Sequence, residues 1–308
     1  MSNLKVRRVR FDLAGDDIPF NWQPEKPAFG VVCNQISFFA PPFENFVVDA
    51  TREAIPHMTD PAAVEEANLY LRQEAQHSAA HVRHTNALIR RWPGLRETLD
   101  EVYASYAHLA ATKPLDYRLA YTACVEATFT PYFKVFLDHD DKFFEPGDER
   151  VASLFLWHFC EEIEHRSSAL IVLNAVRNDY RWRMSCIPSV FKHIGEIVSI
   201  CSRGFQKHVP AEYGGHYGRL MPESFTLTGF RDSAKAAKAL QTPEQNTYAG
   251  VPRKEVLKML YGLVRSQIPS HNPEFEALPT FADRWFRRFD EEPTSARSWY
   301  TVGVGSAS

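Results

Sequence analysis

Two short stretches of the sequence, Glu74-Ala-Gln-His77 and Glu162-Ile-Glu-His165, decide the fold that we expect. In each, a glutamate stands three residues before a histidine, which places both side chains on one helix face and within reach of a single ion. Alone, such a pair says little, because chance pairs are common and mostly lie on solvated faces. The residues around the two pairs therefore decide how they are interpreted.

Both pairs interrupt apolar stripes of helical periodicity. With a rotation of about 100° per residue, one stripe runs Ala67, Leu71, Glu74, His77, His81, Thr85, Leu88 and the other Phe155, Phe159, Glu162, His165, Ala169, Leu173, Val176. A charged group on such an inward face costs a large free energy unless it is paired or coordinated. The pattern indicates cations between the helices. Buried Glu–His or Glu–Arg pairs without metal, with Arg52, Arg72 or Arg166 as partners, are the alternative.

Single carboxylates repeat this pattern on two further helices. Glu126 lies on a stripe with Leu119 and Phe133, and Glu44 lies on one with Val48. One Glu from each of two helices, plus Glu-x-x-His from two others, is the ligand set of ferritin-like di-iron and di-manganese bundles. The predicted ligands of two metal ions are Glu44, Glu74, His77, Glu126, Glu162 and His165. Four carboxylates balance two divalent ions, and oxygen and imidazole donors suit iron, manganese or zinc; we expect iron.

Further residues on the same faces have candidate roles near the metals. His81 and His158 are each interpreted as a third nitrogen ligand, a hydrogen-bonding partner of a ligand or a core residue, with His158 the first choice as ligand. The flanking Glu161 is expected to affect metal binding much less than Glu74 or Glu162. The residues expected to line a substrate pocket are Phe129, Phe133, Phe155 and Phe159.

The sequence predicts an all-α protein with a ferritin-like four-helix bundle and additional C-terminal helices. We divide it into an N-terminal arm (1–40), the bundle (41–180) and a C-terminal extension packed on the bundle (181–308). Prolines and capping residues place helix starts. The expected helices are 41–58, 59–91, 95–111, 114–137, 150–178, 188–205, 253–266 and 275–289, with loops at 138–149 and 210–222 and a frayed end after Gly303.

Composition limits the partners and the compartment. A net charge of -3 gives no general attraction for nucleic acid. Five scattered cysteines without a Cys-x-x-Cys pair indicate a reducing compartment, and no secretory signal is visible, so we expect the cytoplasm. The stretch 187–205 carries too many charges to span a bilayer, but it could contact a membrane peripherally or pack against a second subunit in a homodimer.

Several of these stretches resemble a known bacterial family. They are Ser37-Phe-Phe-Ala-Pro-Pro-Phe-Glu44-Asn-Phe, Gln73-Glu-Ala-Gln-His77-Ser-Ala-Ala-His81, Ala123-Cys-Val-Glu126 and Trp157-His-Phe-Cys-Glu-Glu-Ile-Glu-His165-Arg-Ser. The sequence is similar over about residues 5–205 to the predicted metal-dependent hydrolases, which are placed with ferritin-like di-metal proteins. It departs at Phe43, where the family tends to have Gly. The resemblance implies hydrolysis without fixing a substrate. In ligand pattern alone, the histidine before Glu162 also resembles arylamine N-oxygenases, which are di-iron enzymes.

Three functions fit this pattern. The first is an O2-activating di-iron oxidoreductase acting on a small apolar or aromatic molecule, with O2 and an electron donor as its other partners. Four carboxylates with few histidines favour iron and redox chemistry. The alternative is a two-metal hydrolase, in which the ions would activate water. A non-catalytic metal-binding or scaffold protein is the third.

Overall fold

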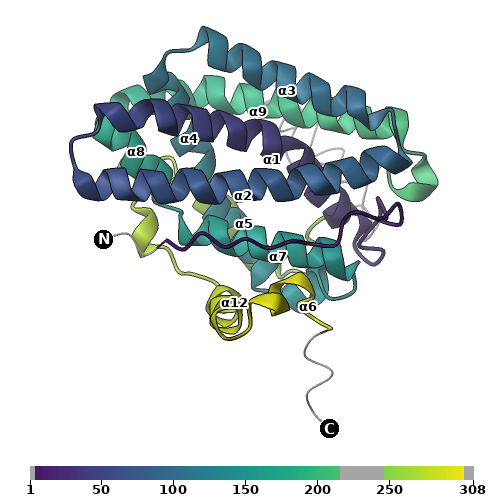
Figure 1. Cartoon of the computed structure of the whole chain (residues 1–308). Helices are drawn as coiled ribbons and strands as arrows, with labels where there is room; N and C mark the ends of the chain where they lie inside the picture. The colour runs from purple at the N-terminus through teal and green to yellow at the C-terminus, as the bar shows by residue number, and fades with distance from the viewer. Residues whose placement is uncertain (1–3, 216–245, 302–308) are drawn as a thin grey trace.

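The computed structural model describes residues 4–215 and 246–301, and this part of the chain is helical without β-strands. The prediction of an all-α fold is confirmed. Two long helices, α1 (Pro27–Ala54) and α2 (Pro61–Arg91), pack side by side in the middle of the molecule (Figure 1). Helix α3 (Leu95–Thr112) packs against α9 (Tyr180–His208) on one side of this pair. No helix in the described residues is long and apolar enough to cross a membrane.

Helix α1 begins at Pro27, so the expected start at Pro41 and the arm boundary at residue 40 are wrong. The chain places Pro27 in the first turn, where a proline is well tolerated, whereas Pro41 and Pro42 lie inside the helix. Almost every residue of α1 is buried. A helix that is buried all round shows no amphipathic period, which explains why residues 27–40 look irregular in the sequence. The extensive packing of α1 outweighs the two backbone hydrogen bonds that its prolines remove.

Helix α2 has the bounds that its capping residues predict. The Asp60 side chain accepts a hydrogen bond of 3.0 Å from the backbone N–H of Ala62, and Pro61 occupies the first helical position. A 3-10 turn, Ile55–His57, connects α1 to this cap. The two central helices are therefore antiparallel neighbours joined by a short link.

The expected helix 114–137 is two helices, α4 (Leu115–Glu126) and α5 (Phe129–Leu137). Pro131 explains the break, because it has no N–H to donate to the carbonyl of Ala127 and its ring would clash with that carbonyl. Thr128 stabilises the turn by donating from Oγ1 to the carbonyl of Val125 at 2.6 Å. Glu126 is consequently the last residue of α4. The expected loop 138–149 contains a short helix, α6 (Asp140–Phe143).

The expected helix 150–178 is also interrupted, as α7 (Glu149–Glu164) and α8 (Ser168–Val176). His165 is the first residue beyond α7, and its φ of -94° and ψ of 15° are no longer helical. Ser167 lies in the interruption and Ser168 begins α8, and serine side chains at such positions compete with helical backbone bonds. Both breaks fall next to residues that we expected to bind metal.

The C-terminal helices begin and end differently from the prediction in two places. Helix α9 starts at Tyr180, where Asp179 caps two backbone N–H groups, and Pro188 is inside it. Helix α12 is Thr280–Glu291, while Phe275 belongs to a 3-10 turn, Pro273–Phe275. The remaining elements are a 3-10 turn Ala211–Tyr213, α11 (Arg253–Arg265) and a 3-10 turn Pro293–Arg297. Most of the expected loop 210–222 and the residues after Gly303 lie outside the described residues.

The segment before α1 runs along α7 as an extended chain (Figure 1). Its side chains alternate: Arg7, Val9 and Phe11 are buried, whereas Arg8 and Arg10 are exposed. The Phe11 ring lies 5.6 Å from that of Trp157 on α7. The arm thereby seals one side of the region in which the predicted ligands lie.

Candidate metal centre

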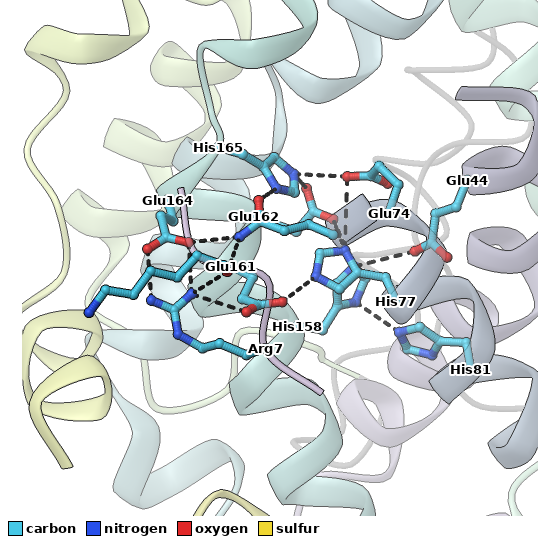
Figure 2. Close-up of polar contacts among 12 residues, drawn as sticks. Arg7, Glu44, Glu74, His77, His81, His158, Glu161, Glu162, Glu164 and His165 are labelled. Carbon is cyan, nitrogen blue, oxygen red and sulfur yellow. Dashed lines mark hydrogen bonds and ion pairs between the residues drawn. The ribbon is translucent and has the colours of Figure 1, made fainter. Parts of the chain in front are cut away.

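Four helical segments direct carboxylates and imidazoles toward one buried place (Figure 2). Helix α1 supplies Glu44, α2 supplies Glu74 and His77, and the C-terminal end of α4 supplies Glu126. Helix α7 supplies His158 and Glu162, and His165 follows its last residue. All of these side chains are buried. The structure thus brings together all six predicted ligands, including Glu44 after the unusual Phe43, and adds His158.

These residues form two groups, each with the geometry to hold one metal ion. The first comprises Glu44, His77, His158 and Glu162, and the second comprises Glu74, Glu126, Glu162 and His165. Within a group, the candidate ligand atoms all lie within 4.8 Å of one another. Glu162 belongs to both groups. A carboxylate with one oxygen toward each group is suited to bridge two ions.

The two carboxylate oxygens of Glu162 have different neighbours. Oε1 lies 2.8 Å from His158 Nε2 and 3.3 Å from His77 Nδ1. Oε2 lies 3.0 Å from His165 Nε2, which is also 3.1 Å from Glu74 Oε1 and 3.5 Å from Glu126 Oε2. His158 Nε2 is 3.5 Å from Glu44 Oε1. Each oxygen of the shared carboxylate therefore faces a different set of donors.

Several atoms at the centre are buried without a hydrogen-bond partner in the described part of the chain. They are Glu44 Oε2, both carboxylate oxygens of Glu74, His77 Nδ1 and Glu126 Oε1. Glu74 Oε1 is close to His165 Nε2, but that nitrogen directs its hydrogen bond to Glu162. Buried carboxylates that accept no hydrogen bond need cations beside them. Oxygen and imidazole donors without thiolates fit iron, manganese or zinc, so the residues fit a pair of such ions.

The charge balance of the cluster is visible in its pKa values. Burial, and then the neighbouring carboxylates, raise the pKa of Glu44 and Glu74 well above the usual range. Burial and the charge of Glu162 raise the pKa of Glu126 to about 7. Burial would also raise the pKa of Glu162, but His165 and imidazole hydrogen bonds hold it well below its usual range. Without metal, the cluster therefore retains protons that metal ions would displace.

A second layer of hydrogen bonds orients two of the imidazoles. His77 Nε2 donates to Glu161 Oε2 at 2.9 Å, and Glu161 Oε1 accepts from Arg7 at 3.1 Å. Arg7 also makes two hydrogen bonds to Glu164, at 2.8 and 2.9 Å (Figure 2). Sequence reasoning missed Arg7, for which the alternation of buried and exposed residues along the arm is the available signal. The carboxylate of Glu161 fixes the imidazole so that Nδ1 faces the cluster.

His165 is held in a similar way by an amide. Gln73 Nε2 donates to Glu164 Oε2 at 2.7 Å and to the carbonyl of Lys5 at 2.9 Å, which leaves Gln73 Oε1 facing His165. His165 Nδ1 donates to this oxygen at 3.1 Å. Its Nε2 is therefore free to face the carboxylates. The N-terminal arm supports both imidazoles, through Arg7 and through the carbonyl of Lys5.

His158 begins a buried chain of hydrogen bonds that leads away from the cluster. Its Nδ1 lies 2.8 Å from His81 Nε2; His81 Nδ1 lies 2.8 Å from Ser37 Oγ; and Ser37 Oγ lies 2.7 Å from His84 Nδ1. A metal-facing Nε2 on His158 requires a proton on Nδ1, which then donates to His81. His81 in turn donates to Ser37, and the Ser37 hydroxyl donates to His84. His81 accordingly supports His158 and belongs to neither metal-binding group.

An apolar cavity of about 610 Å³ reaches the cluster. It touches Glu44, His158 and Glu162, and its walls come from α1, α5, α9 and α11. Phe129 and Phe133 line it as expected. Phe155 and Phe159 do not: Phe159 stacks behind Phe133 at 3.9 Å between ring centroids, and Phe155 packs against the rings of His81 and His84. Sequence reasoning missed the lining residues Ile187, Phe191, Ile194 and Val198, the apolar face of α9.

The arginines considered as partners of buried carboxylates in a metal-free cluster have other contacts. Arg52 donates to Asp49 at 2.8 Å, and Arg166 donates to the backbone carbonyls of Pro273 and Ile163. Among the described residues, Arg72 makes no ion pair with the cluster. None of these three arginines therefore neutralises the central carboxylates in the described part of the chain.

Comparison with known proteins gives a match at the level of the family. A search of curated proteins and a search of solved structures returned no match. A family model described as "Predicted metal-dependent hydrolase" matches residues 5–210. The matched region includes the arm, all candidate ligands and most of the cavity wall. The chain therefore belongs to this family of predicted metal-dependent hydrolases.

Proposed function

We propose that this protein is a two-metal enzyme that activates O2 to oxidise a small apolar or aromatic substrate. One observation carries the proposal: four carboxylates and three imidazoles converge at the inner end of an apolar cavity. Two iron ions held there would supply the electrons for reducing O2, and an external electron donor would restore them. Carboxylate-rich donor sets favour iron, and apolar walls favour chemistry from which water must be excluded.

The residues of the chain have distinct tasks in this proposal. Glu162 spans the two groups, and Glu74 and Glu126 complete the charge balance of the second group. Phe129 and Phe133 exclude water from the part of the cavity next to His158 and provide a surface for an aromatic or aliphatic substrate. Glu44 lies at the boundary between cavity and cluster, so its carboxylate is placed to hold a proton during the reaction.

Two-metal hydrolysis is the second candidate, and the description of the family favours it. Two divalent ions would lower the pKa of a bound water and polarise the group that it attacks. In that reaction Glu44 is the side chain placed to accept a proton from the water. The apolar cavity wall would then select an ester or amide with a hydrophobic body. The oxidoreductase proposal rests on the donor set and the cavity, not on the comparisons.

Metal analysis combined with anaerobic assays distinguishes these candidates. An oxidoreductase purified with iron should contain about two ions per chain and show near-ultraviolet absorption that dithionite bleaches and air restores. Its turnover should stop under argon. A hydrolase should turn over ester or amide substrates under argon with zinc or manganese. Absence of bound metal, together with an unchanged melting temperature after chelation, would refute both and leave a scaffold role.

A further inference from the structure

Helix α11 presents an apolar stripe on its outer surface. Leu257, Leu260, Tyr261 and Val264 have 63%, 48%, 67% and 70% of their surface exposed. With a rotation of about 100° per residue, these four side chains fall within one sector of the helix, opposite the buried Met259. Large apolar side chains that cluster on an exposed face mark an interaction surface, whereas isolated ones need no explanation.

Basic residues flank this stripe on one side. Lys254, Lys258 and Arg265 share a neighbouring sector of α11. The two lysines make no ion pair with any described residue, whereas Arg265 lies near enough to Glu276 to favour its charged form. The acidic residue of the helix, Glu255, points elsewhere and pairs with His139 Nε2 at 2.6 Å. The outer face of α11 is therefore apolar and cationic, although the whole chain has a net charge of -3. This pattern is typical of helices that lie on anionic lipid surfaces.

The stripe is continuous with the cavity that reaches the cluster. Leu260 and Val264 are exposed on α11 and also line the cavity. Met184 on α9 and Ile268 after α11 are likewise both exposed and part of the cavity lining. A molecule that leaves an apolar phase at this face therefore meets apolar side chains along its way to Glu44 and His158.

We propose that α11 and the adjacent cavity opening dock on an anionic lipid bilayer, from which the apolar substrate enters. The apolar stripe would insert at the level of the lipid headgroups, and the basic flank would lie against anionic headgroups. A second copy of the chain fits this face less well, because a symmetric contact would bring two sets of unpaired cations into one interface. The entry of substrate rests on the proposed enzymatic function; the docking does not.

Vesicle flotation tests the docking with the full-length, metal-loaded protein. Vesicles of phosphatidylcholine alone are compared with vesicles that also contain phosphatidylglycerol, at low and at high salt. We expect binding to the anionic vesicles that high salt weakens. Two double variants separate the contributions: Lys254→Glu with Lys258→Glu, and Leu257→Ser with Tyr261→Ser. Each should weaken binding about tenfold or more. Arg8→Glu with Arg10→Glu changes net charge equally on the exposed face of the arm and should bind as wild type.

The outcomes distinguish docking from catalysis. Metal content is measured for every variant, and none of the substituted residues lines the cavity or the cluster. The proposal would be overturned if wild type and both α11 variants bound the vesicles equally. It would also be overturned if the wild-type protein bound neither kind of vesicle. A wild-type dimer in size-exclusion chromatography that Leu257→Ser with Tyr261→Ser converts to a monomer would assign this face to a second copy instead. Lipid binding by a protein that cannot be loaded with metal, and whose melting temperature does not change after chelation, would uphold docking and refute the proposed function.

Discussion

His77 and Glu161 form a fully buried hydrogen bond, 2.9 Å between His77 Nε2 and Glu161 Oε2. Glu161 is held in turn by Arg7 from the N-terminal arm. A carboxylate that accepts from one imidazole nitrogen fixes the ring and makes its other nitrogen a better ligand. This contact connects Glu161 to the metal centre through His77, although Glu161 belongs to neither metal-binding group. We still expect Glu161 to affect metal binding less than Glu74 or Glu162.

Glu161 should therefore be sensitive to the chemistry of its replacement. Glu161→Ala leaves His77 Nε2 without its acceptor and removes one of the acceptors of Arg7, which keeps its bonds to Glu164. We expect metal affinity to fall about 10- to 100-fold. Glu161→Gln keeps one oxygen to accept from His77 and should retain more of the affinity. Competition with a chromophoric chelator gives both affinities. Equal affinities for the alanine variant and wild type would contradict the orienting role of Glu161.

Glu162 and Glu44 should differ in the number of ions that they affect. Glu162→Gln alters the carboxylate shared by both groups and should lower the occupancy of two ions, whereas Glu44→Gln alters one group and should mainly lower one. Elemental analysis of the purified variants measures the stoichiometry. Glu101→Gln, an exposed substitution on α3, is the matched control. An identical loss in the Glu44 and Glu162 variants would argue against a shared carboxylate.

Ser37 should be important for stability although it touches no candidate ligand. It links His81 to His84 with bonds of 2.8 and 2.7 Å, and Ser37→Ala leaves both imidazole nitrogens unsatisfied. We expect the free energy of unfolding to fall by about 1–3 kcal/mol, as measured by urea titration. Ser185→Ala, which removes an exposed serine whose hydroxyl donates to the carbonyl of Trp182 in its own helix, should change the free energy of unfolding little. A similar decrease in both variants would show that the buried hydrogen bonds of Ser37 contribute no more to stability than an exposed serine does.

The stability of the metal-free protein should decrease as pH rises above about 6.5. Glu44, Glu74 and Glu126 have raised pKa values, so their contribution is full below the ordinary glutamate pKa of 4.5 and is lost as pH rises through the folded values. His77 and His165 also have raised pKa values and act in the same direction. The groups with lowered pKa values act oppositely, losing stability as pH falls: His81, His84, His158 and Glu162.

As pH rises above the ordinary histidine pKa of 6.5, the groups with lowered values become deprotonated in both the folded and the unfolded state, so the loss from the groups with raised values dominates. The melting temperature of chelator-treated protein should therefore fall between pH 6.5 and about 8. The metal-loaded protein should show a much flatter profile, because bound ions replace the protons. A metal-free melting temperature that rises over this interval would contradict the raised pKa values. Differential scanning fluorimetry of both forms provides the comparison.

The family and the helical class could be predicted from local sequence patterns. Capping by Asp60 and Pro61 placed the start of α2, and the stripes around Glu74 and Glu162 identified inward faces correctly, because helical periodicity is a local property. The interruption before Pro131 and the start of α1 at Pro27 were missed. A proline ends one helix and is tolerated in another, depending on the packing that surrounds it.

What the sequence determined by itself is which helix faces carry ionisable side chains that burial in a core makes costly. Only the tertiary structure decided which atoms meet. It directs the two oxygens of Glu162 toward separate sets of donors and places His158 in one metal-binding group. It places His81 outside both groups, hydrogen-bonded to His158. It also brought Arg7 from the arm to Glu161, across a large separation in the chain. Periodicity fixes the direction of a side chain around its own helix, whereas distances between helices depend on how whole cores pack.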